Sequence, residues 1–447
     1  MHKSGNEVPF WSAVAIGIGS MVGAGIFALL GEAGAIAGSA VWVSFIIGGV
    51  IALLSGYSIG RLGARYPAAG GMVEYLVQGF GVGRFSGAMS VMMYISALVA
   101  VSLVARTFGS YAHALLPTGA PGWLVEVFAA AIVLFFMLVN LDGARAMARL
   151  ENMVVLVKMI VLVAFAIVGL IYMSPERLSP RQYPPVPMIF YSVAVTFFAY
   201  EGFRVVTNAA EDMRDPARTL PRAIMTAILL VMAVYVGIAI SVFGNLPPAD
   251  VIQARDFALA EAAKPIFGET GFTIVATAAL FATASAINAS LYAVTNVTYQ
   301  LAKLGELPGV FGAPIAHSRE GLVVSSFAII LLAVFFDLSS IAVIGALSML
   351  LIHTTTHIGH LKLLRETRAS AVLVVFAIVA NGGAFVLGGY HLTQTRPLLL
   401  AWIAAFFLIA LCLELFLRHV TERAVRTRHG HTREHTEDGH GAAIGNR

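Results

Sequence analysis

Long apolar segments constrain the fold of this chain more than any other feature of its sequence. They cover roughly residues 10–36, 40–63, 82–112, 122–141, 150–173, 187–211, 221–244, 271–302, 321–336, 339–361, 370–390 and 397–418. A helix of about 20 apolar residues crosses the hydrocarbon core of a bilayer, so each segment is about long enough for one crossing. Charged residues make up only 12% of the chain, whereas soluble domains carry about 25%. The sequence therefore predicts an all-α polytopic membrane protein with twelve transmembrane helices.

The basic residues predict the orientation of these helices. Most Lys and Arg residues of the predicted loops fall on the side of the N-terminus, and the other side receives Arg177, Arg181, Arg255, Lys264 and Arg396. Cytoplasmic loops are enriched in Lys and Arg. We therefore expect both termini in the cytoplasm and the helices in the cytoplasmic (inner) membrane. The N-terminal tail, 1–9, is short, and the His-rich tail, 421–447, is expected to be disordered and solvated rather than a metal site.

Glycines interrupt the first apolar segment. Gly17, Gly19, Gly23 and Gly25 lie within nine residues, and a glycine in a helix interior costs about 1 kcal/mol relative to alanine. These positions predict a break in the first helix. A break inside the membrane exposes backbone groups that water cannot reach, and it is tolerated only where it lines a cavity or contacts a ligand. We expect this break to form half of a small-molecule site near the bilayer midplane.

A second interruption is expected in the sixth segment, where Glu201, Gly202 and Arg204 stand inside an otherwise apolar run. It comes five segments after the first interruption. Breaks at matching positions of two five-helix halves are typical of inverted repeats with a binding site between them. The sequence therefore predicts a first repeat over 10–173, a second over 187–361, and two helices outside the repeats over 370–420.

Lys158 lies deep in the fifth segment. It follows Arg149, which marks the cytoplasmic start of that segment, by nine residues. At 1.5 Å per residue, Lys158 is roughly 13 to 14 Å into a core about 30 Å thick. An ammonium charge is costly there, so the amine is expected to be neutral part of the time. Such a lysine would couple transport to protons; the alternative is a permanently charged lysine held by backbone carbonyls for stability.

Glu201 is a second candidate for proton coupling. Its carboxylate has three available partners: the start of the half-helix that follows, the Arg204 guanidinium, or the amino group of a substrate. It is also a candidate to bind a proton itself. These roles stay as alternatives at the level of sequence.

Polar side chains recur in the eighth segment, where Thr283, Ser285 and Asn288 follow near-helical spacing. Small hydroxyl residues in membrane helices most often support close packing of helices. Beside a glycine break, the same hydroxyls are well placed to hold a sodium ion or, without sodium, the Lys158 ammonium.

Aromatic residues near the two interruptions are candidates for the walls of a pocket. They are Tyr94 in the third segment and Phe198 and Tyr200 in the sixth. The alternative for each is a place in the core. The loop at about 245–270 is longer than its neighbours and mildly amphipathic, and it is expected to form either one or two short helices that cover the outer face or a plain connector.

Motifs of other functional classes are missing from the sequence. It contains no Gly-x-x-x-x-Gly-Lys-Ser/Thr run, so no ATP-driven motor is expected, and neither His-Glu-x-x-His nor a cysteine cluster indicates a metal enzyme. The sequence therefore predicts no enzyme activity, no cofactor, no metal and no nucleic-acid partner.

Four stretches of the sequence resemble the amino acid, polyamine and organocation (APC) transporter superfamily. Residues 19–27, Gly-Ser-Met-Val-Gly-Ala-Gly-Ile-Phe, resemble its first-helix signature, and residues 200–224 are similar to its sixth helix and the following loop. Residues 67–75 and 301–308 match the loops after its second and eighth helices. Within the superfamily, the chain looks closest to an archaeal proton-coupled amino acid transporter that carries a lysine in helix five, where Lys158 falls.

The resemblance implies a LeuT-type fold, in which helices 1–5 and 6–10 form inverted repeats, two helices are added, and helices 1 and 6 are discontinuous. It also implies that the Lys158 ammonium takes the place of sodium in sodium-coupled relatives, near Gly19, Val22, Thr283 and Ser285. The substrate-binding residues it implies are Ser20, Met21, Val22, Gly23, Ala24 and Gly25 in the first helix, Phe198, Ala199, Tyr200, Glu201 and Gly202 in the sixth, and Tyr94.

These observations together predict a secondary transporter that imports amino acids by alternating access and is driven by protons through Lys158. Its expected partners are an amino acid, protons and the lipid bilayer. One alternative is an exchanger of cationic amino acids or polyamines, which Glu201 favours. Another is a channel or a transport-dead sensor of amino acids.

Overall fold

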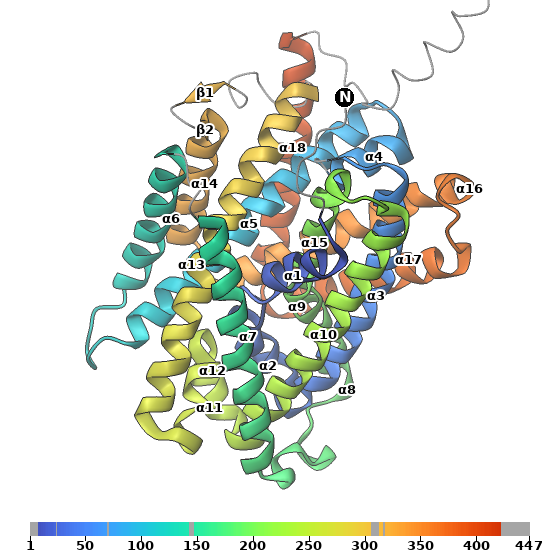
Figure 1. Ribbon diagram of the computed structural model, residues 1–447. Coiled ribbons are helices and arrows are strands. Elements are labelled where there is room, and N and C mark those ends of the chain that lie inside the picture. The colour runs from blue at the N-terminus through green and yellow to red at the C-terminus, as the bar shows by residue number, and fades with distance from the viewer. Residues whose placement is uncertain are drawn as a thin grey trace, which may run out of the picture.

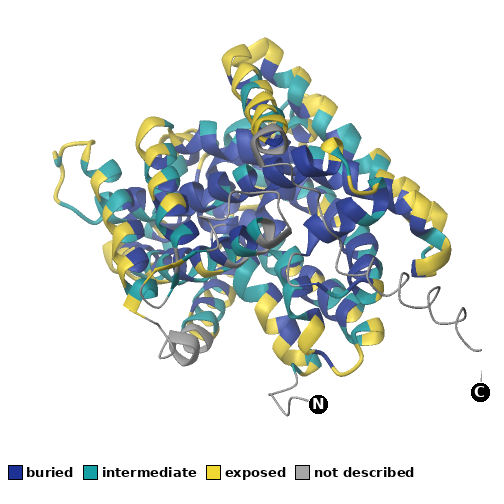
Figure 2. Ribbon diagram, turned by 90° about the horizontal axis from the view of Figure 1, so that it is seen from above, coloured by how far each residue is buried: buried dark blue, intermediate teal, exposed yellow. Residues whose placement is uncertain are grey.

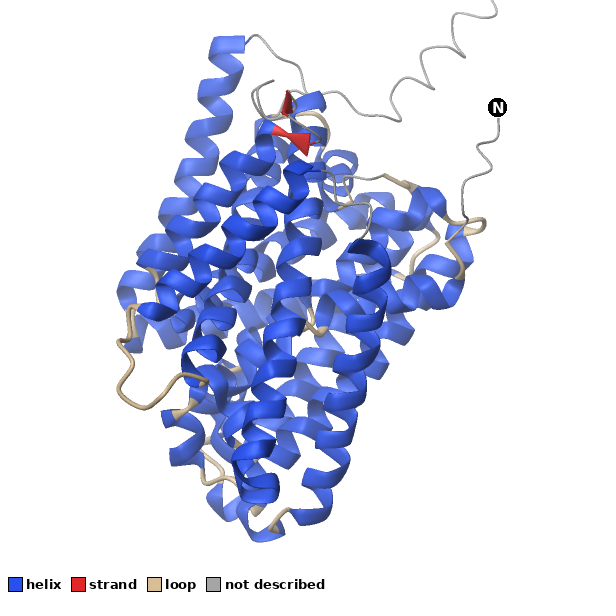
Figure 3. Ribbon diagram, turned by 60° about the vertical axis from the view of Figure 1, so that its left-hand side comes forward, coloured by secondary structure: helices blue, strands red, loops and turns tan. Residues whose placement is uncertain are grey.

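The computed structural model describes residues 8–23, 25–68, 71–142, 147–304, 313–315 and 318–421, and this part of the chain is almost entirely helical (Figure 3). Ten of its helices are long and apolar enough to cross a membrane, and the shorter helices Phe10–Met21 and Glu320–Phe335 are also apolar. The prediction of a helical polytopic membrane protein is therefore confirmed. The two predicted tails lie almost wholly outside the described residues.

The helices follow the apolar segments of the sequence (Figure 1). The first half of the chain forms α1 (Phe10–Met21), α2 (Gly25–Ala37), α3 (Val41–Arg65), α4 (Met72–Phe80), α5 (Arg84–Ala114), α6 (Leu124–Asp142) and α7 (Met147–Tyr172). The second half forms α8 (Val186–Tyr191), α9 (Val193–Ala199), η4 (Glu201–Asp212), α10 (Pro216–Asn245), α11 (Pro248–Gln253), α12 (Ala258–Glu261), α13 (Lys264–Leu304), α14 (Glu320–Phe335), α15 (Leu338–His360), α16 (Leu364–Thr367), α17 (Ala371–Thr395) and α18 (Pro397–Thr421).

Short elements connect these helices. The 3-10 turns are η1 (Gly38–Ala40), η2 (Pro175–Leu178), η3 (Pro180–Gln182), η5 (Arg255–Phe257) and η7 (Leu361–Leu363). Strands β1 (Pro314–Ile315) and β2 (Ser318–Arg319) form a small antiparallel hairpin before α14. The short helices expected at 245–270 are present as α11, η5 and α12.

Burial separates central helices from peripheral ones. Most of the apolar window of α5 and of α15 is buried, whereas less than a third of the corresponding windows of α6, α7, α17 and α18 is buried. Figure 2 shows the same distribution, with buried residues in the middle of the bundle and exposed ones around its rim. Large apolar side chains on the rim, such as Leu138, Ile160, Val379 and Phe416, are exposed. An apolar rim of this kind faces lipid, while the interior holds the polar groups.

Packing brings the two interrupted segments together. α1 packs against η4 and α10, and α2 packs against α9. The ends of both segments therefore meet in the middle of the bundle, beside α5 and α13.

Candidate functional site

The first helix is broken between α1 and α2. α1 ends at Met21, the Val22 N–H donates to the Ile18 carbonyl at 2.9 Å, and α2 begins at Gly25. A Cβ atom at Gly25 would overlap the Tyr235 hydroxyl and the Ala199 carbonyl. Glycine at this position therefore allows the first and sixth segments to approach within backbone contact.

Tyr235 of α10 joins the two segments. Its hydroxyl is fully buried, donates to the Met21 carbonyl at 2.7 Å and lies 3.5 Å from the Ala199 carbonyl. The last carbonyls of a helix have no partner inside that helix. Tyr235 thus satisfies a carbonyl that the break in the first helix leaves without a helical partner.

The sixth segment changes its helix type instead of opening a gap. α9 ends at Ala199, Tyr200 forms a turn, and Glu201–Asp212 continues as a 3-10 helix of 12 residues. Runs of 3-10 helix longer than about four residues are uncommon and often mark hinges or strain. A Cβ at Gly202 would overlap the backbone of Ser20 and Met21, so the tight contact with α1 accompanies this change in helix type.

A cavity of about 100 Å³ lies between the two segments. This is well above the roughly 10–15 Å³ that one water needs. Residues from both interrupted segments, α5 and α13 form its lining: Ser20, Met21, Gly25, Leu29, Ala100, Leu103, Val104, Phe198, Ala199, Glu201, Gly202, Arg204, Val205, Ala286 and Ser290. Most of the residues implied by the sequence are thus brought to one space.

Other implied residues have different surroundings. Gly23 packs against Ala286, and the Tyr200 hydroxyl donates to the Phe45 carbonyl at 2.9 Å. The Tyr94 hydroxyl shares a hydrogen bond of 2.8 Å with Ser325 of α14. Together with the buried Val22, these residues are not part of the lining given above. Ala24 lies outside the described residues.

Lys158 reaches the end of α1 from α7. Its Nζ donates to the Gly19 carbonyl at 2.9 Å, and the residue is only 2% exposed. Of the two hydroxyls expected near this amine, Thr283 donates to the Ala279 carbonyl of its own helix at 2.7 Å. Ser285 lies on the same helix, α13, and is partly exposed.

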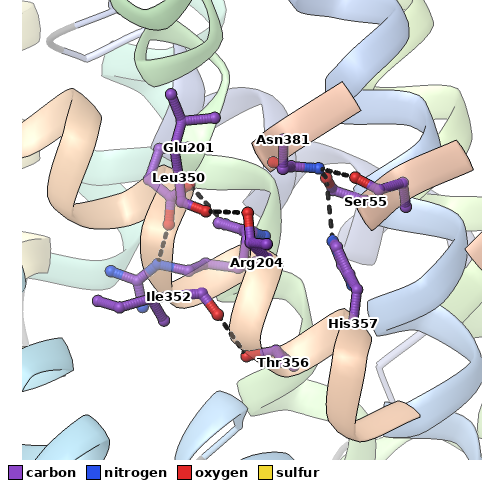
Figure 4. A network of polar contacts seen from close by, with 11 residues as sticks. Ser55, Glu201, Arg204, Leu350, Ile352, Thr356, His357 and Asn381 are labelled. Carbon is purple, nitrogen blue, oxygen red and sulfur yellow. Dashed lines mark hydrogen bonds and ion pairs between the residues drawn. The ribbon is translucent and has the colours of Figure 1, made fainter. Parts of the chain in front are cut away.

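Glu201 forms a buried cluster with Arg204 and His353. The Arg204 Nε donates to Oε1 of Glu201 at 2.6 Å, as Figure 4 shows, and the His353 Nε2 donates to Oε2 at 2.8 Å. Both carboxylate oxygens therefore accept hydrogen bonds within the protein. The cluster borders the cavity through Glu201 and Arg204.

Sequence reasoning missed Tyr235 and His353. The signal for His353 was present, because an ionisable residue inside a membrane segment is a functional candidate by default. Tyr235 gave a weaker signal, since a single tyrosine in an apolar segment is as consistent with core packing.

The segment between α10 and α13 packs against α2. Arg255 of η5 reaches Glu32 of α2, with Nε and Oε1 3.6 Å apart, and its backbone lies against Gly31. Burial raises the pKa of the neighbouring Asp256 carboxyl, against the opposing effect of Arg255 and Arg106. These contacts hold the loop on α2.

The sequence is similar to those of known transport proteins. A family model described as amino acid permease matches residues 9–427. The uncharacterized protein MJ0609 of Methanocaldococcus jannaschii is 35% identical over 425 residues, which cover 95% of this chain and 98% of that protein. The inner membrane transport protein YbaT of Escherichia coli is 33% identical over 424 residues, 94% and 99% of the two chains. The serine/threonine exchanger SteT of Bacillus subtilis is 24% identical over 421 residues, 88% and 94% of the two chains.

The family match spans nearly the whole chain, and the named relatives with an assigned role are transporters. The apolar helices of the structure agree with this assignment. The chain therefore belongs to the amino acid permease family of the APC superfamily, and it is a multi-pass membrane transporter rather than an enzyme.

Proposed function

We propose that this protein imports amino acids by alternating access and couples their uptake to protons through Lys158. The observation that carries the proposal is the buried hydrogen bond from the Lys158 Nζ to the Gly19 carbonyl, 2.9 Å long and next to the break in the first helix. Hydrogen bonds from a charged donor are roughly twice as strong as neutral ones. Protonation of Lys158 therefore holds α7 against α1, and release of the proton loosens that contact.

The change in contact between α7 and α1 on protonation of Lys158 can alter the affinity of the cavity for substrate. Gly19 is two residues before Met21, which lines the cavity. A ligand shifts a conformational equilibrium only by binding one state more tightly than the other. A proton on Lys158 favours the state in which α1 is fixed, and a substrate that needs this state binds more tightly when the proton is present.

The substrate contacts of the proposal are the backbone groups at the two interruptions. The start of α2 at Gly25 presents the positive end of a helix dipole, which suits a carboxylate. The carbonyls at 198–201 suit an ammonium group. Ser20, Met21, Gly25, Phe198 and Gly202 border the same cavity, which supports these roles.

Small neutral amino acids fit this site better than cationic ones. Both oxygens of Glu201 are already bonded, to Arg204 and His353, so the carboxylate is not available to a second cation without loss of an internal partner. The cavity is small, about 100 Å³. The printed name of the relative SteT gives serine and threonine as what that protein exchanges, and these amino acids are therefore the first substrates to test.

The proposed topology has twelve crossings, with repeats over 10–173 and 187–361, two added helices over 370–420, and both termini in the cytoplasm. The pairing of α1 and α2 with η4 and α9 supports a LeuT-type arrangement. The name of YbaT, an inner membrane protein, supports the cytoplasmic membrane as the location.

Uptake into proteoliposomes tests the proposal. Purified protein is reconstituted without sodium, an inward proton gradient is applied, and entry of each radiolabelled proteinogenic L-amino acid is measured. We expect saturable uptake of small neutral amino acids that the proton gradient accelerates, and we expect Lys158→Ala to lose this acceleration while remaining folded. Uptake that keeps its full proton dependence in Lys158→Ala would overturn the coupling mechanism.

A further inference from the structure

Three histidines lie along one face of α15. His353, His357 and His360 are four and three residues apart, the spacing that places side chains on the same side of a helix. Each is at most 1% exposed. His353 contacts Glu201 at the cavity, and His360 is the last residue of α15, at the end of the bundle where α16 lies.

Hydrogen bonds connect His357 with this end of the bundle. Nδ1 of His357 is 2.9 Å from the Ser58 hydroxyl, and the same hydroxyl is 2.7 Å from Nδ1 of His360. Nε2 of His360 is 2.9 Å from the Thr367 hydroxyl. A continuous series of hydrogen bonds therefore joins His357 to Thr367 through Ser58 of α3 and His360.

The direction of every bond in the chain follows from its last member. The Thr367 hydroxyl donates to the Leu363 carbonyl at 2.9 Å, so Nε2 of His360 donates to Thr367. In neutral His360, Nδ1 then accepts from Ser58, and Ser58 accepts from Nδ1 of His357. Each hydrogen atom thus points toward the α16 end, as a proton path in that direction requires.

The same assignment leaves Nε2 of His357 as an acceptor. Ser55 donates to it at 3.2 Å, and the Asn381 amide of α17 donates to Ser55 at 2.8 Å (Figure 4). The Ser55 contact is the longest hydrogen bond in this group. It is therefore the one most easily replaced by an incoming proton donor.

The path has one interruption, between His353 and His357. Their ring centroids are 5.7 Å apart, and Nδ1 of His353 is buried and has no hydrogen-bond partner among the described residues. Because Nε2 of His353 donates to Glu201, Nδ1 is the nitrogen that can bind another proton. A water or a rotation of one ring would close the interruption.

Charged groups face this series of contacts at the cavity end, from two helices that pack against α15, and around the Thr367 end. η4 faces His353 with Glu201, and Arg204 bonds the same carboxylate. The uncharged polar groups next to the rest of α15 are the Ser55 and Ser58 hydroxyls of α3 and the Asn381 amide of α17. The neighbouring helices also carry two buried carboxyl groups, Glu74 of α4, which accepts a hydrogen bond from Gln78, and Glu414 of α18. Around the Thr367 end lie Lys362, Arg365 and Glu366. Lys362, Arg365 and Glu366 are exposed, so the path ends at a charged, solvated surface.

We propose that His353, His357, Ser58, His360 and Thr367 form a proton path from the substrate cavity to the α16 end of the bundle. One proton leaves Nδ1 of His353 and binds Nε2 of His357, which releases its Nδ1 proton to Ser58. Ser58 passes its own proton to Nδ1 of His360, and His360 gives its Nε2 proton to the Thr367 hydroxyl, whose own proton turns away from the Leu363 carbonyl and is released to water. One proton is transferred in total, and every group of the path is neutral at the end. The inference rests on the proposed function, because it gives the transported proton its exit.

Two transport modes separate this path from a structural role. Net uptake driven by a proton gradient requires proton release, whereas exchange of labelled for unlabelled substrate at equal pH does not. The variants His357→Gln and His360→Gln keep a hydrogen-bonding side chain that cannot carry a proton through. Both modes are measured in proteoliposomes with a mixture of radiolabelled proteinogenic L-amino acids, and a pH-sensitive dye inside the vesicles reports proton entry.

We expect each variant to lower net uptake and proton entry by about 100-fold, the lower end of what a positioned proton-transfer group contributes, with exchange unchanged. His391→Gln is the matched control, since His391 stacks on Tyr191 at 4.8 Å, away from the path, and both modes should stay unchanged. Ser58→Ala removes a single oxygen atom and should give the same separation of modes if a histidine variant fails to fold.

The outcomes distinguish the path from the proposed function. Equal loss of net uptake and exchange in all path variants would show a structural role and overturn the path. Unchanged net uptake in the path variants, with loss in Lys158→Ala, would overturn the path and leave lysine coupling in place. Unchanged proton dependence in Lys158→Ala, with loss in the path variants, would support the path and overturn lysine coupling.

Discussion

Replacement of Tyr235 by phenylalanine removes one oxygen atom at the contact between the two interrupted segments. The loss of folding stability that we expect depends on the group to which this oxygen is hydrogen-bonded. The Tyr235 hydroxyl is fully buried and donates to the Met21 carbonyl at 2.7 Å. That carbonyl is in the last turn of α1, where helix geometry supplies no partner inside the helix. A buried acceptor left unsatisfied costs about 1–3 kcal/mol.

Tyr200→Phe is a matched comparison. Tyr200 is also fully buried, its ring centroid lies 5.3 Å from that of Tyr235, and its hydroxyl donates to the Phe45 carbonyl at 2.9 Å. Phe45 is inside α3, so its carbonyl keeps its helical hydrogen bond when the tyrosine oxygen is removed. The expected cost is then that of an ordinary hydrogen bond, about 0.5–1.5 kcal/mol.

Unfolding of each variant by sodium dodecyl sulfate in mixed micelles, followed by circular dichroism, measures the difference. We expect Tyr235→Phe to destabilise the protein more than Tyr200→Phe. If the joined arrangement is the one that binds substrate, the half-saturating substrate concentration of Tyr235→Phe should also rise, by up to about 5- to 150-fold for about 1–3 kcal/mol. If the two variants lose equal stability, or Tyr200→Phe loses more, the Met21 carbonyl does not depend on Tyr235 for its hydrogen bond.

Three further predictions concern the cavity and Lys158. Lys158→Met and Lys158→Arg should both remove the change of uptake with pH, which is about tenfold or more if the charge-assisted bond contributes about 1.5–3 kcal/mol. Lys264→Met at the start of α13 should retain this pH dependence, and pH-dependent uptake by Lys158→Arg would contradict the prediction. Glu201→Gln should lower uptake of neutral and cationic amino acids alike, because its carboxylate bonds the protein on both oxygens, and selective loss of cations would favour the cationic exchanger. Gly202→Ala should destabilise the protein by about 1–3 kcal/mol. Gly237→Ala is the control, because its new Cβ would lie 3.6 Å from its nearest neighbour, and it should leave stability unchanged or raise it in the same assay. Similar losses of stability in both variants would show that the close contact at Gly202 does not determine the cost.

Much of the fold could be read from hydropathy. An apolar segment must form its backbone hydrogen bonds internally when it enters lipid, so its length alone predicts a helix. The break near Gly23 was likewise visible, since glycine weakens a helix wherever it stands. In the sixth segment, the same reasoning predicted an interruption, and the α-helix does end there, at Ala199; that the chain continues as a 3-10 helix, with Gly202 packed directly on the backbone of α1, was not predicted.

The candidate site shows the limit of this reasoning. The depth of Lys158 follows from counting along one helix, but its acceptor, Gly19, is 139 residues away. Glu201 was visible as a buried charge, yet three partners were open to it, and His353, which bonds it, is 152 residues away and was not considered. Tyr94 was expected at the cavity but bonds Ser325 on a neighbouring helix.

The sequence by itself predicted which segments are apolar enough to cross a membrane, where the first helix weakens, and that Lys158 and Glu201 lie within apolar segments. Each of these properties depends on the solvation and backbone preferences of a residue and its near neighbours in the chain. Only the tertiary structure decided that Tyr235 satisfies the end of α1, that Glu201 is bonded on both oxygens, and that two histidines of α15 bond the same serine of α3. Such partners depend on how separate helices rotate and pack against each other, and the apolar pattern of one helix does not specify which polar group of another it will face.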